Sequence, residues 1–255
     1  MDSPRTPSNV TDKERPQKIV VLKLSPNTDV EAAAEVATMK NLKKTSFKRP
    51  QEIVYVIVGR SKQKFGMHKD HLCATSQYFK AALEGNFEEA ELGEVALADT
   101  SVSAFGLFNE WLYTGKIAEE LCQEEGLTNV ELYNKDRPTF RQLLDAWNLA
   151  DYLLVPQLQN HIMDMMQAKY EKRKVVPKCQ FSYFYEHTQA GSPMRKFLVD
   201  LCVWRWYGQS ENYTRHGASI PPEMAMELVV ALARRLEERD TPFFVTESYH
   251  VPLKA

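Results

Sequence analysis

The sequence IVYVIVG at residues 53–59 opens the stretch, ending at Gly115, on which the fold of this chain depends. Residues 53–58 are almost wholly apolar, which is typical of a central β-strand that is covered on both faces. The polar turn RSKQ at residues 60–63 leads into a second predicted strand at residues 64–67. Because the connection is short, we expect these two strands to pair as a hairpin.

Helical patterns follow, interrupted by one more strand. Residues 70–75 predict a short helix, and Ser76 can cap the next one, which Gly85 would end. A third strand is expected at residues 94–98, and Asp99 or Thr100 can cap the helix after it. Apolar residues recur at helical spacing and predict core-facing sides. They are Leu72, Phe79, Ala82 and Leu83, and then Val102, Phe105, Phe108, Trp111 and Leu112.

Residues 118–138 break this pattern with an acidic insertion, which we expect to be a solvated loop, with or without a helical turn. Thr139 can cap the next helix, and the pair Val155-Pro156 should end it. Pro156 can open a further helix. The apolar residues of these two helices are Phe140, Leu143, Leu144, Trp147, Ala150 and Leu154, and then Leu158, Ile162 and Met165.

The remainder of the chain predicts a small all-helical extension. Basic residues 168–178 are interpreted as a linker, and residues 179–255 as the extension. Helices are expected at residues 181–189 and 194–207, with a polar loop at residues 209–220. The apolar positions of the second helix and of a last helix opened by Pro221-Pro222 are Phe197, Leu198, Leu201, Cys202 and Trp204, and then Met226, Val229, Val230, Ala233 and Leu236.

The order of these pieces resembles the BTB/POZ domain, and the form resembles the short BTB proteins of filamentous fungi. The family pattern is a strand, F-x-x-H-[KR]-x-x-L, S-x-[YF]-F, and an aromatic helix that ends in [WY]-[LI]-Y-[TS]-G. In this chain the pattern is carried by Phe65, His68, Leu72, Ser76, Tyr78, Phe79, Trp111, Tyr113 and Gly115. The resemblance implies an α+β fold, with a small sheet flanked by a helical cluster over residues 51–167.

The residues before the first core strand leave two alternatives open. Residues 1–17 are rich in Pro, Ser, Thr and charge and are expected to be disordered. Residues 18–50 contain a possible strand at residues 19–22 and a helix at residues 29–42. In dimeric members of the family, an N-terminal strand and helix pack against the partner chain. The other interpretation is a loosely held leader with some helical bias.

Composition excludes several classes of function. The net charge of −2 argues against a dedicated nucleic-acid surface, and no apolar run is long enough to span a membrane. The four cysteines are widely spaced, without a C-x-x-C pair, which favours a reducing intracellular setting, cytoplasmic or nuclear. No small-molecule substrate or cofactor motif is evident, and we expect a protein that is not an enzyme.

One cluster of candidate metal ligands leaves a metal-dependent enzyme as an alternative function. His68, His71 and Cys73 have the spacing H-x-x-H-x-C, which supplies zinc-ligand types without an evident fourth ligand. In the family, the residue at the position of His68 joins the second strand to the first helix. We therefore predict that His68 satisfies backbone groups and that the chain has no metal site and no catalytic residue.

The candidate partner-binding residues are Phe87 and Glu89. BTB domains that recruit a cullin scaffold of a ubiquitin ligase carry an apolar-x-Glu motif at this place. The hypotheses are thus a substrate adaptor for such a ligase or a homotypic scaffold, such as a homodimer, that is linked to transcription without a DNA-binding domain of its own. Many dimeric members also pair an Asp before the first strand with the basic residue after the motif histidine. Lys69 supplies the basic residue, but Glu52 is displaced, so this charged pocket is expected to be absent or rearranged.

Overall fold

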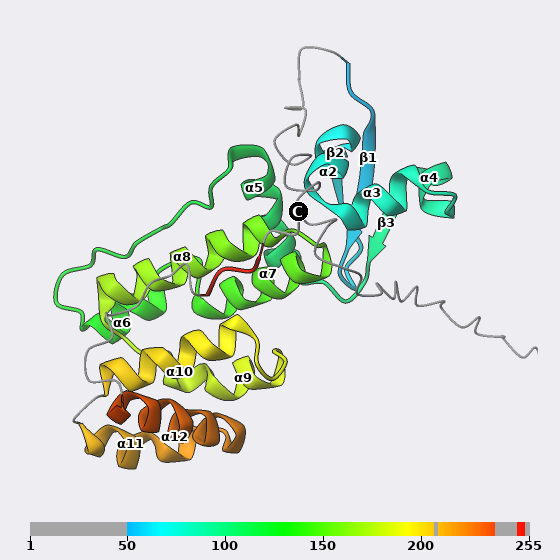
Figure 1. Ribbon diagram of the computed structural model, residues 1–255. Helices are drawn as coiled ribbons and strands as arrows, with labels where there is room; N and C mark the ends of the chain where they lie inside the picture. The colour runs from blue at the N-terminus through cyan, green and yellow to red at the C-terminus, as the bar shows by residue number, and fades with distance from the viewer. Residues whose placement is uncertain (1–49, 207–208, 238–248, 253–255) are drawn as a thin grey trace, which may run out of the picture. The chain divides into compact units, whose positions relative to one another are not determined.

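The computed structural model describes residues 50–206, 209–237 and 249–252 (Figure 1). The predictions for residues 1–17, for the strand and helix within residues 18–49, and for most of the tail after residue 240 lie outside this part of the chain. The elements are β1 (Ile53–Val58), β2 (Gln63–His68), α2 (Lys69–Thr75), α3 (Gln77–Glu84), α4 (Glu88–Leu92), β3 (Glu94–Leu97), α5 (Val102–Thr114), α6 (Asn129–Lys135), α7 (Phe140–Tyr152), α8 (Pro156–Arg173), η1 (Lys178–Gln180), α9 (Phe181–Glu186), α10 (Pro193–Arg205), α11 (Ser210–His216), η2 (Gly217–Ser219) and α12 (Pro222–Glu237).

The sheet has three strands in the order β2-β1-β3, with β1 at its centre. β1 pairs antiparallel with β2, which places Val54 opposite Met67 and confirms the predicted hairpin. It pairs parallel with β3, which places Val56 opposite Val95. A parallel pair needs a long connection, and α2, α3 and α4 supply it.

Side chains of β1 alternate between core and solvent. Val54, Val56 and Val58 are buried, whereas Ile53 and Tyr55 on the other face are 45% and 40% exposed. The prediction that both faces of this strand are covered is therefore wrong for the described residues. Composition did not reveal this, because isoleucine and tyrosine favour strands on either face.

Aromatic side chains from β2, α3 and α5 form the centre of the core next to the sheet. The ring centroids of Phe79 and Phe108 lie 6.2 Å apart, and those of Phe65 and Phe105 lie 4.8 Å apart. Phe79, Phe105 and Phe108 are fully buried, and Trp111 is half-buried at the edge. The predicted core faces of α3 and α5 are thus confirmed, and these rings contribute much of the buried apolar area.

Helix caps follow the sequence with one exception. Ser76 caps α3 and Thr139 caps α7, each through its hydroxyl, as predicted. The predicted cap of α5 is wrong, because Ser101 occupies this position and not Asp99 or Thr100. Three adjacent side chains that can each accept a bond from the helix backbone leave the sequence ambiguous here.

Helices α7 and α8 form the predicted helical hairpin (Figure 1). The prediction that Leu154 extends the apolar face of α7 is wrong: α7 ends at Tyr152, Leu153 is buried, and Leu154 is 43% exposed. Leu154 has a φ of +56°, a left-handed backbone conformation that is unfavourable for a leucine. Because the chain reverses before Pro156, Leu153 and not Leu154 faces the core.

The acidic insertion is fastened to the end of α8. Asp136 is fully buried, and its carboxylate accepts hydrogen bonds from Nε and Nη2 of Arg173 at 2.8 and 2.7 Å. Lys169 Nζ lies 3.8 Å from this carboxylate, and the backbone N–H of Cys122 donates to it at 2.9 Å. We call these four residues the Asp136 lock. The Arg173 guanidinium holds the pKa of Asp136 below its usual range.

The prediction that residues 118–138 form a solvated loop is therefore wrong for its second half. Residues 129–135 form α6, which starts with a capping box between Thr128 and Glu131. Tyr133 is buried, with its ring centroid 5.4 Å from that of Phe140. A high acidic content indicated solvation, but the one carboxylate with two cationic partners is drawn into the core.

The predicted linker is also partly wrong. Residues 168–173 continue α8, which ends at Lys174 in a left-handed conformation. Val176 and Pro177 after it are buried. Lys169 and Arg173 are four residues apart, so both face Asp136 from one side of the helix.

Helices α9 to α12 make up the predicted helical extension, and α10 packs against α12 (Figure 1). The loop predicted at residues 209–220 is wrong, because this segment forms α11 and η2. Tyr213 of α11 lies against Trp206, with ring centroids 5.2 Å apart. The polar composition of α11 gave no sign that Tyr213 would pack against Trp206 and hold this helix in place.

The buried side of α12 differs from the one that the sequence suggested. Met224 and Leu228 are buried, whereas Met226, Val229 and Val230 are 66%, 60% and 47% exposed. The helix carries two apolar stripes, and helical periodicity alone does not say which one meets α10.

Side-chain contacts join the extension to the preceding helices. The Tyr183 hydroxyl of α9 donates to Asp145 of α7 at 2.5 Å, and Arg141 lies over the Tyr183 ring at 3.9 Å. Near the C-terminus, Asn160 of α8 bonds both backbone groups of Val251. Within the described part of the chain, none of the helices combines the length and the apolar composition that crossing a membrane requires.

Candidate partner-binding surface

The motif residues His68 and Tyr113 join the end of β2 to the end of α5. The Tyr113 hydroxyl accepts a hydrogen bond from the backbone N–H of His68 at 3.0 Å and lies 2.9 Å from Nδ1 of the same residue. His68 thus lies at the junction of β2 and α2, where its imidazole contacts the Tyr113 hydroxyl, and its satisfying of backbone groups stays a prediction. Gly115 ends α5 in a left-handed conformation, with a φ of +71°.

Ser76 performs a similar function between α3 and α7. It is fully buried, accepts the hydrogen bond from the N–H of Phe79 at 3.2 Å, and donates its own proton to the carbonyl of Leu153 at 2.6 Å. One hydroxyl therefore satisfies a helix start and the carbonyl at a helix end. Leu72 is fully buried beside it in the same core.

The geometry does not assemble His68, His71 and Cys73 into a metal site. His71 Nε2 donates to the carbonyl of Leu112 at 2.7 Å, and the Cys73 thiol lies 3.8 Å from the carbonyl of Phe79. Burial, followed by the charge of Glu84, raises the pKa of Cys73 to about 11. Across the described ranges, no group of three or more His, Cys, Asp or Glu side chains is placed to hold a metal ion.

Lys69 and Glu52 do meet, although the sequence predicted that this charged pocket is absent or rearranged. Lys69 Nζ lies 3.0 Å from Oε2 of Glu52, and the N–H of Lys69 donates to the carbonyl of Glu52 at 2.9 Å. The backbone bond extends the pairing of β1 with β2 by one residue, so the two side chains leave the hairpin together.

The candidate anchor Phe87 lies in the turn between α3 and α4. It is 46% exposed and is the residue immediately before α4, whose first turn contains Glu89. Gly85 ends α3 beneath the Phe87 ring. A Cβ atom at Gly85 would lie 2.8 Å from that ring and 2.4 Å from the carbonyl of Ala81. Glycine is thus the residue that lets the aromatic ring fold back over the end of α3.

Two tyrosines extend this site from α4 to the end of α7. The Tyr152 hydroxyl donates to that of Tyr78 at 3.2 Å, and their ring centroids lie 4.9 Å apart. Burial first, then the bond to Tyr152 and the charge of Glu89, raise the pKa of Tyr78. We call Tyr78, Phe87, Glu89 and Tyr152 the corner surface.

The sequence named Phe87 and Glu89 as partner-binding candidates and Tyr78 only as a residue of the family motif. Tyr152 was missed, and it is 56% exposed. Its position could have identified it. Tyr152 comes directly before the chain reversal at Leu153-Leu154, where an aromatic side chain has no place in the core. A binding site commonly combines exposed aromatic rings with a few polar groups, which is the composition found here.

The comparison with protein-family models agrees with the motif. Residues 46–170 match the family model of the BTB/POZ domain. A search of curated proteins found no match. Among solved structures, the chain is similar to the BTB domain of human gigaxonin, at 16% sequence identity and a TM-score of 0.31, over 57% of this chain and 99% of that one. On the family match and the motif residues above, residues 46–170 of this chain form a BTB/POZ domain, a module of protein–protein interaction.

Proposed function

We propose that this protein is a non-catalytic adaptor that recruits the cullin scaffold of a ubiquitin ligase through the corner surface. The observation that carries the proposal is Phe87, which stays 46% exposed in a fixed turn beside the carboxylate of Glu89. An aromatic anchor releases water on binding, and a neighbouring carboxylate accepts hydrogen bonds that fix orientation. BTB domains that recruit cullins have these two groups in this order.

The non-catalytic part of the proposal is supported by the roles of the reactive side chains. His68, His71 and Cys73 each contact a different group of the fold, and the thiol of Cys73 is held protonated by burial. An intracellular setting is supported by the four cysteines, all of which are free.

The test is a pull-down with a purified cullin N-terminal domain, comparing the wild-type protein with the double variant Phe87→Ala, Glu89→Ala. We expect the wild type to retain the cullin domain and the double variant to lose most of it, since both the anchor and its carboxylate are removed. A matched control is the double variant Val229→Ala, Glu223→Ala, which removes one exposed apolar side chain and one exposed carboxylate from α12. The control should bind as the wild type does.

The proposal fails if the folded wild-type protein retains no cullin domain. It also fails if both double variants bind as strongly as the wild type. Circular dichroism on each variant separates loss of binding from loss of fold.

A homotypic scaffold is the second candidate. Ile53 and Tyr55 are apolar and exposed on the outer face of β1, where a second copy could cover them. Such a scaffold could act in transcription through partners, without DNA-binding of its own. Light scattering on the same samples tests it: a dimer that the substitution Tyr55→Lys dissociates supports this candidate, and a wild-type monomer contradicts it.

A further inference from the structure

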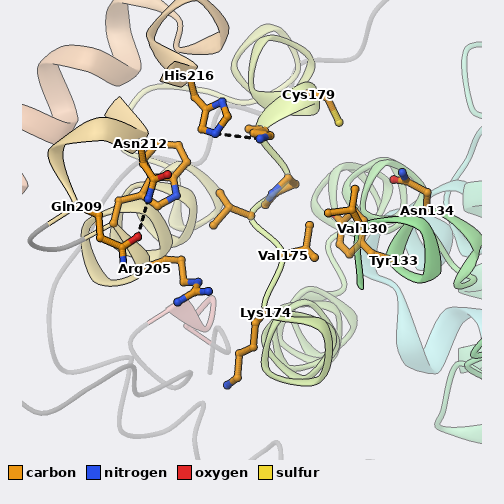
Figure 2. Close-up of a pocket in the computed structure, with 14 residues that line it drawn as sticks. Val130, Tyr133, Asn134, Lys174, Val175, Cys179, Arg205, Gln209, Asn212 and His216 are labelled. Carbon is orange, nitrogen blue, oxygen red and sulfur yellow. Dashed lines mark hydrogen bonds between the residues drawn. The ribbon is translucent and has the colours of Figure 1, made fainter. Parts of the chain in front are cut away.

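A pocket lies between α6, the segment after α8, and the α10–α11 region, and its lining includes no residue of the corner surface (Figure 2). Its volume is about 330 Å³, which is within the range of cavities that hold small ligands or single side chains of a partner. Its lining residues, which we call the basic pocket, are Val130, Tyr133, Asn134, Lys174, Val175, Val176, Pro177, Lys178, Cys179, Arg205, Trp206, Gln209, Asn212 and His216.

The charge of the basic pocket is one-sided. It contains Lys174, Lys178 and Arg205, which we call the pocket cations, and none of the fourteen lining residues is an aspartate or a glutamate. None of the three pocket cations takes part in an ion pair between residues that the structure describes. The protein as a whole has a net charge of −2. Three cations gathered without a carboxylate in such a protein favour an anionic ligand.

Two nitrogen bases also meet inside the pocket. Nζ of Lys178 lies 2.9 Å from Nε2 of His216, as the dashed line in Figure 2 shows. An ammonium group can only donate, so the imidazole accepts and is neutral in this arrangement. Partial burial, followed by the charges of Lys178 and Arg215, lowers the pKa of His216. The local field is therefore positive at this end of the pocket too.

The rest of the lining is apolar or carries amides. Val175 and the buried side chains of Val176 and Trp206 provide an apolar wall. Asn134 and Asn212 provide groups that both donate and accept hydrogen bonds, as a peptide backbone requires. A free inorganic anion would use the cations and leave this wall unused, whereas an extended nucleic acid would need a longer basic track than three side chains.

We propose that the basic pocket binds an acidic peptide segment of a partner protein. One apolar side chain of the peptide lies on the wall formed by the valines and Trp206, and neighbouring carboxylates face the pocket cations. The inference goes beyond the proposed function, because the pocket binds its peptide whether or not a cullin binds the corner surface. In an adaptor, this second site is where a substrate protein would be held.

The test is fluorescence anisotropy of the full-length protein with a short fluorescein-labelled peptide of alternating glutamate and leucine. We expect saturable binding that weakens as salt is raised. The double variant Lys174→Gln, Arg205→Gln should bind at least about tenfold more weakly, since it removes two of the three cations. The matched control is Lys172→Gln, Arg234→Gln, which removes two exposed cations outside the pocket and should change affinity by less than about twofold.

Two further peptides test the chemistry. A glutamine–leucine peptide should bind poorly because it lacks charge, and a glutamate–serine peptide because it lacks apolar side chains. Equal binding of the glutamate–serine peptide would contradict the proposal and indicate a general anion site. Failure of the glutamate–leucine peptide to bind, or equal losses in the two double variants, would overturn it as well. Because no cullin is present in this assay, its outcome is independent of the pull-down.

Discussion

The corner surface and the basic pocket differ in sign, in shape and in how the chain builds them. In the corner surface the exposed ring of Phe87 lies next to the acidic helix α4. In the basic pocket the buried ring of Trp206 lies among cationic side chains. Most of the corner comes from one short stretch between Tyr78 and Glu89, whereas the pocket is assembled from three segments within residues 130–134, 174–179 and 205–216. The two surfaces therefore differ chemically, and the two partners proposed for them need not compete.

The largest effect is expected from removing the carboxylate of the Asp136 lock, which fastens α6 beside the pocket. Asp136→Ala leaves Arg173 and Lys169 next to each other without their carboxylate. Removing one partner from a buried ion pair should lower the free energy of unfolding by about 3–5 kcal/mol. Urea denaturation measures this change.

The control for that variant is Glu124→Ala, which breaks the exposed pair of Glu124 with Lys135 at 2.5 Å. Its effect on unfolding should be small, because solvent and salt screen such pairs. Equal effects of the two substitutions would show that the Asp136 lock does not stabilise the fold. If the lock acts as described, Asp136→Ala should also weaken peptide binding in the pocket while the cullin domain still binds the corner.

The same lock predicts a pH dependence. Because the pKa of Asp136 is depressed in the folded state, its contribution is full above the unfolded pKa of about 3.9 and is lost as pH falls through the lower folded value. The stability difference between the wild type and Asp136→Asn should therefore be constant near neutral pH and shrink below about pH 4. A difference that grows on acidification would contradict the assigned charge state.

A smaller effect is expected from Gly85→Ala, which acts on the corner alone. The added Cβ would meet the Ala81 carbonyl at 2.4 Å and the Phe87 ring at 2.8 Å, so both the end of α3 and the ring must move. We expect cullin-domain affinity to fall about tenfold, measured by calorimetry, with peptide binding unchanged. Gly106→Ala is the matched control, because the added Cβ would meet nothing within 4 Å apart from its chain neighbours and the backbone of its own helix. Similar affinities for both variants would mean that the position of Phe87 does not matter.

The smallest change is expected for Tyr113→Phe, which keeps the ring and removes the hydroxyl that accepts from the His68 N–H. The free energy of unfolding should fall by only about 1 kcal/mol, because the two hydrogen bonds between this hydroxyl and His68 are exposed to solvent. Thermal denaturation measures it. Neither surface contains Tyr113, so both affinities should stay at the wild-type value; a loss of cullin binding would place this junction within the interface.

The features that the sequence predicted correctly are those whose partners are close along the chain. The β1–β2 hairpin follows from a short turn, and the caps Ser76 and Thr139 act on residues three positions away. The Asp136–Arg173 pair was missed because it joins residues 37 positions apart, and no local pattern marks which of several carboxylates becomes buried.

The same limit applies to surfaces. Phe87 and Glu89 could be proposed from a motif, but Tyr152 joins them only through the hairpin of α7 and α8. On α12 the sequence offers two apolar stripes, and contact with α10 decides that Leu228 is buried while Val229 is exposed. The basic pocket could not be predicted, because the basic run at residues 168–178 contains Lys174 and Lys178 but no sequence pattern marks Arg205 as their neighbour.

The most direct test of the central claim is a calorimetric titration of a cullin N-terminal domain into the wild-type protein and into the double variant Phe87→Ala, Glu89→Ala. The account predicts saturable binding to the wild type and at least about a tenfold loss in the variant, with Val229→Ala, Glu223→Ala unchanged. Undetectable binding to a folded wild-type protein, or equal affinity for the wild type and the Phe87 variant, would contradict it.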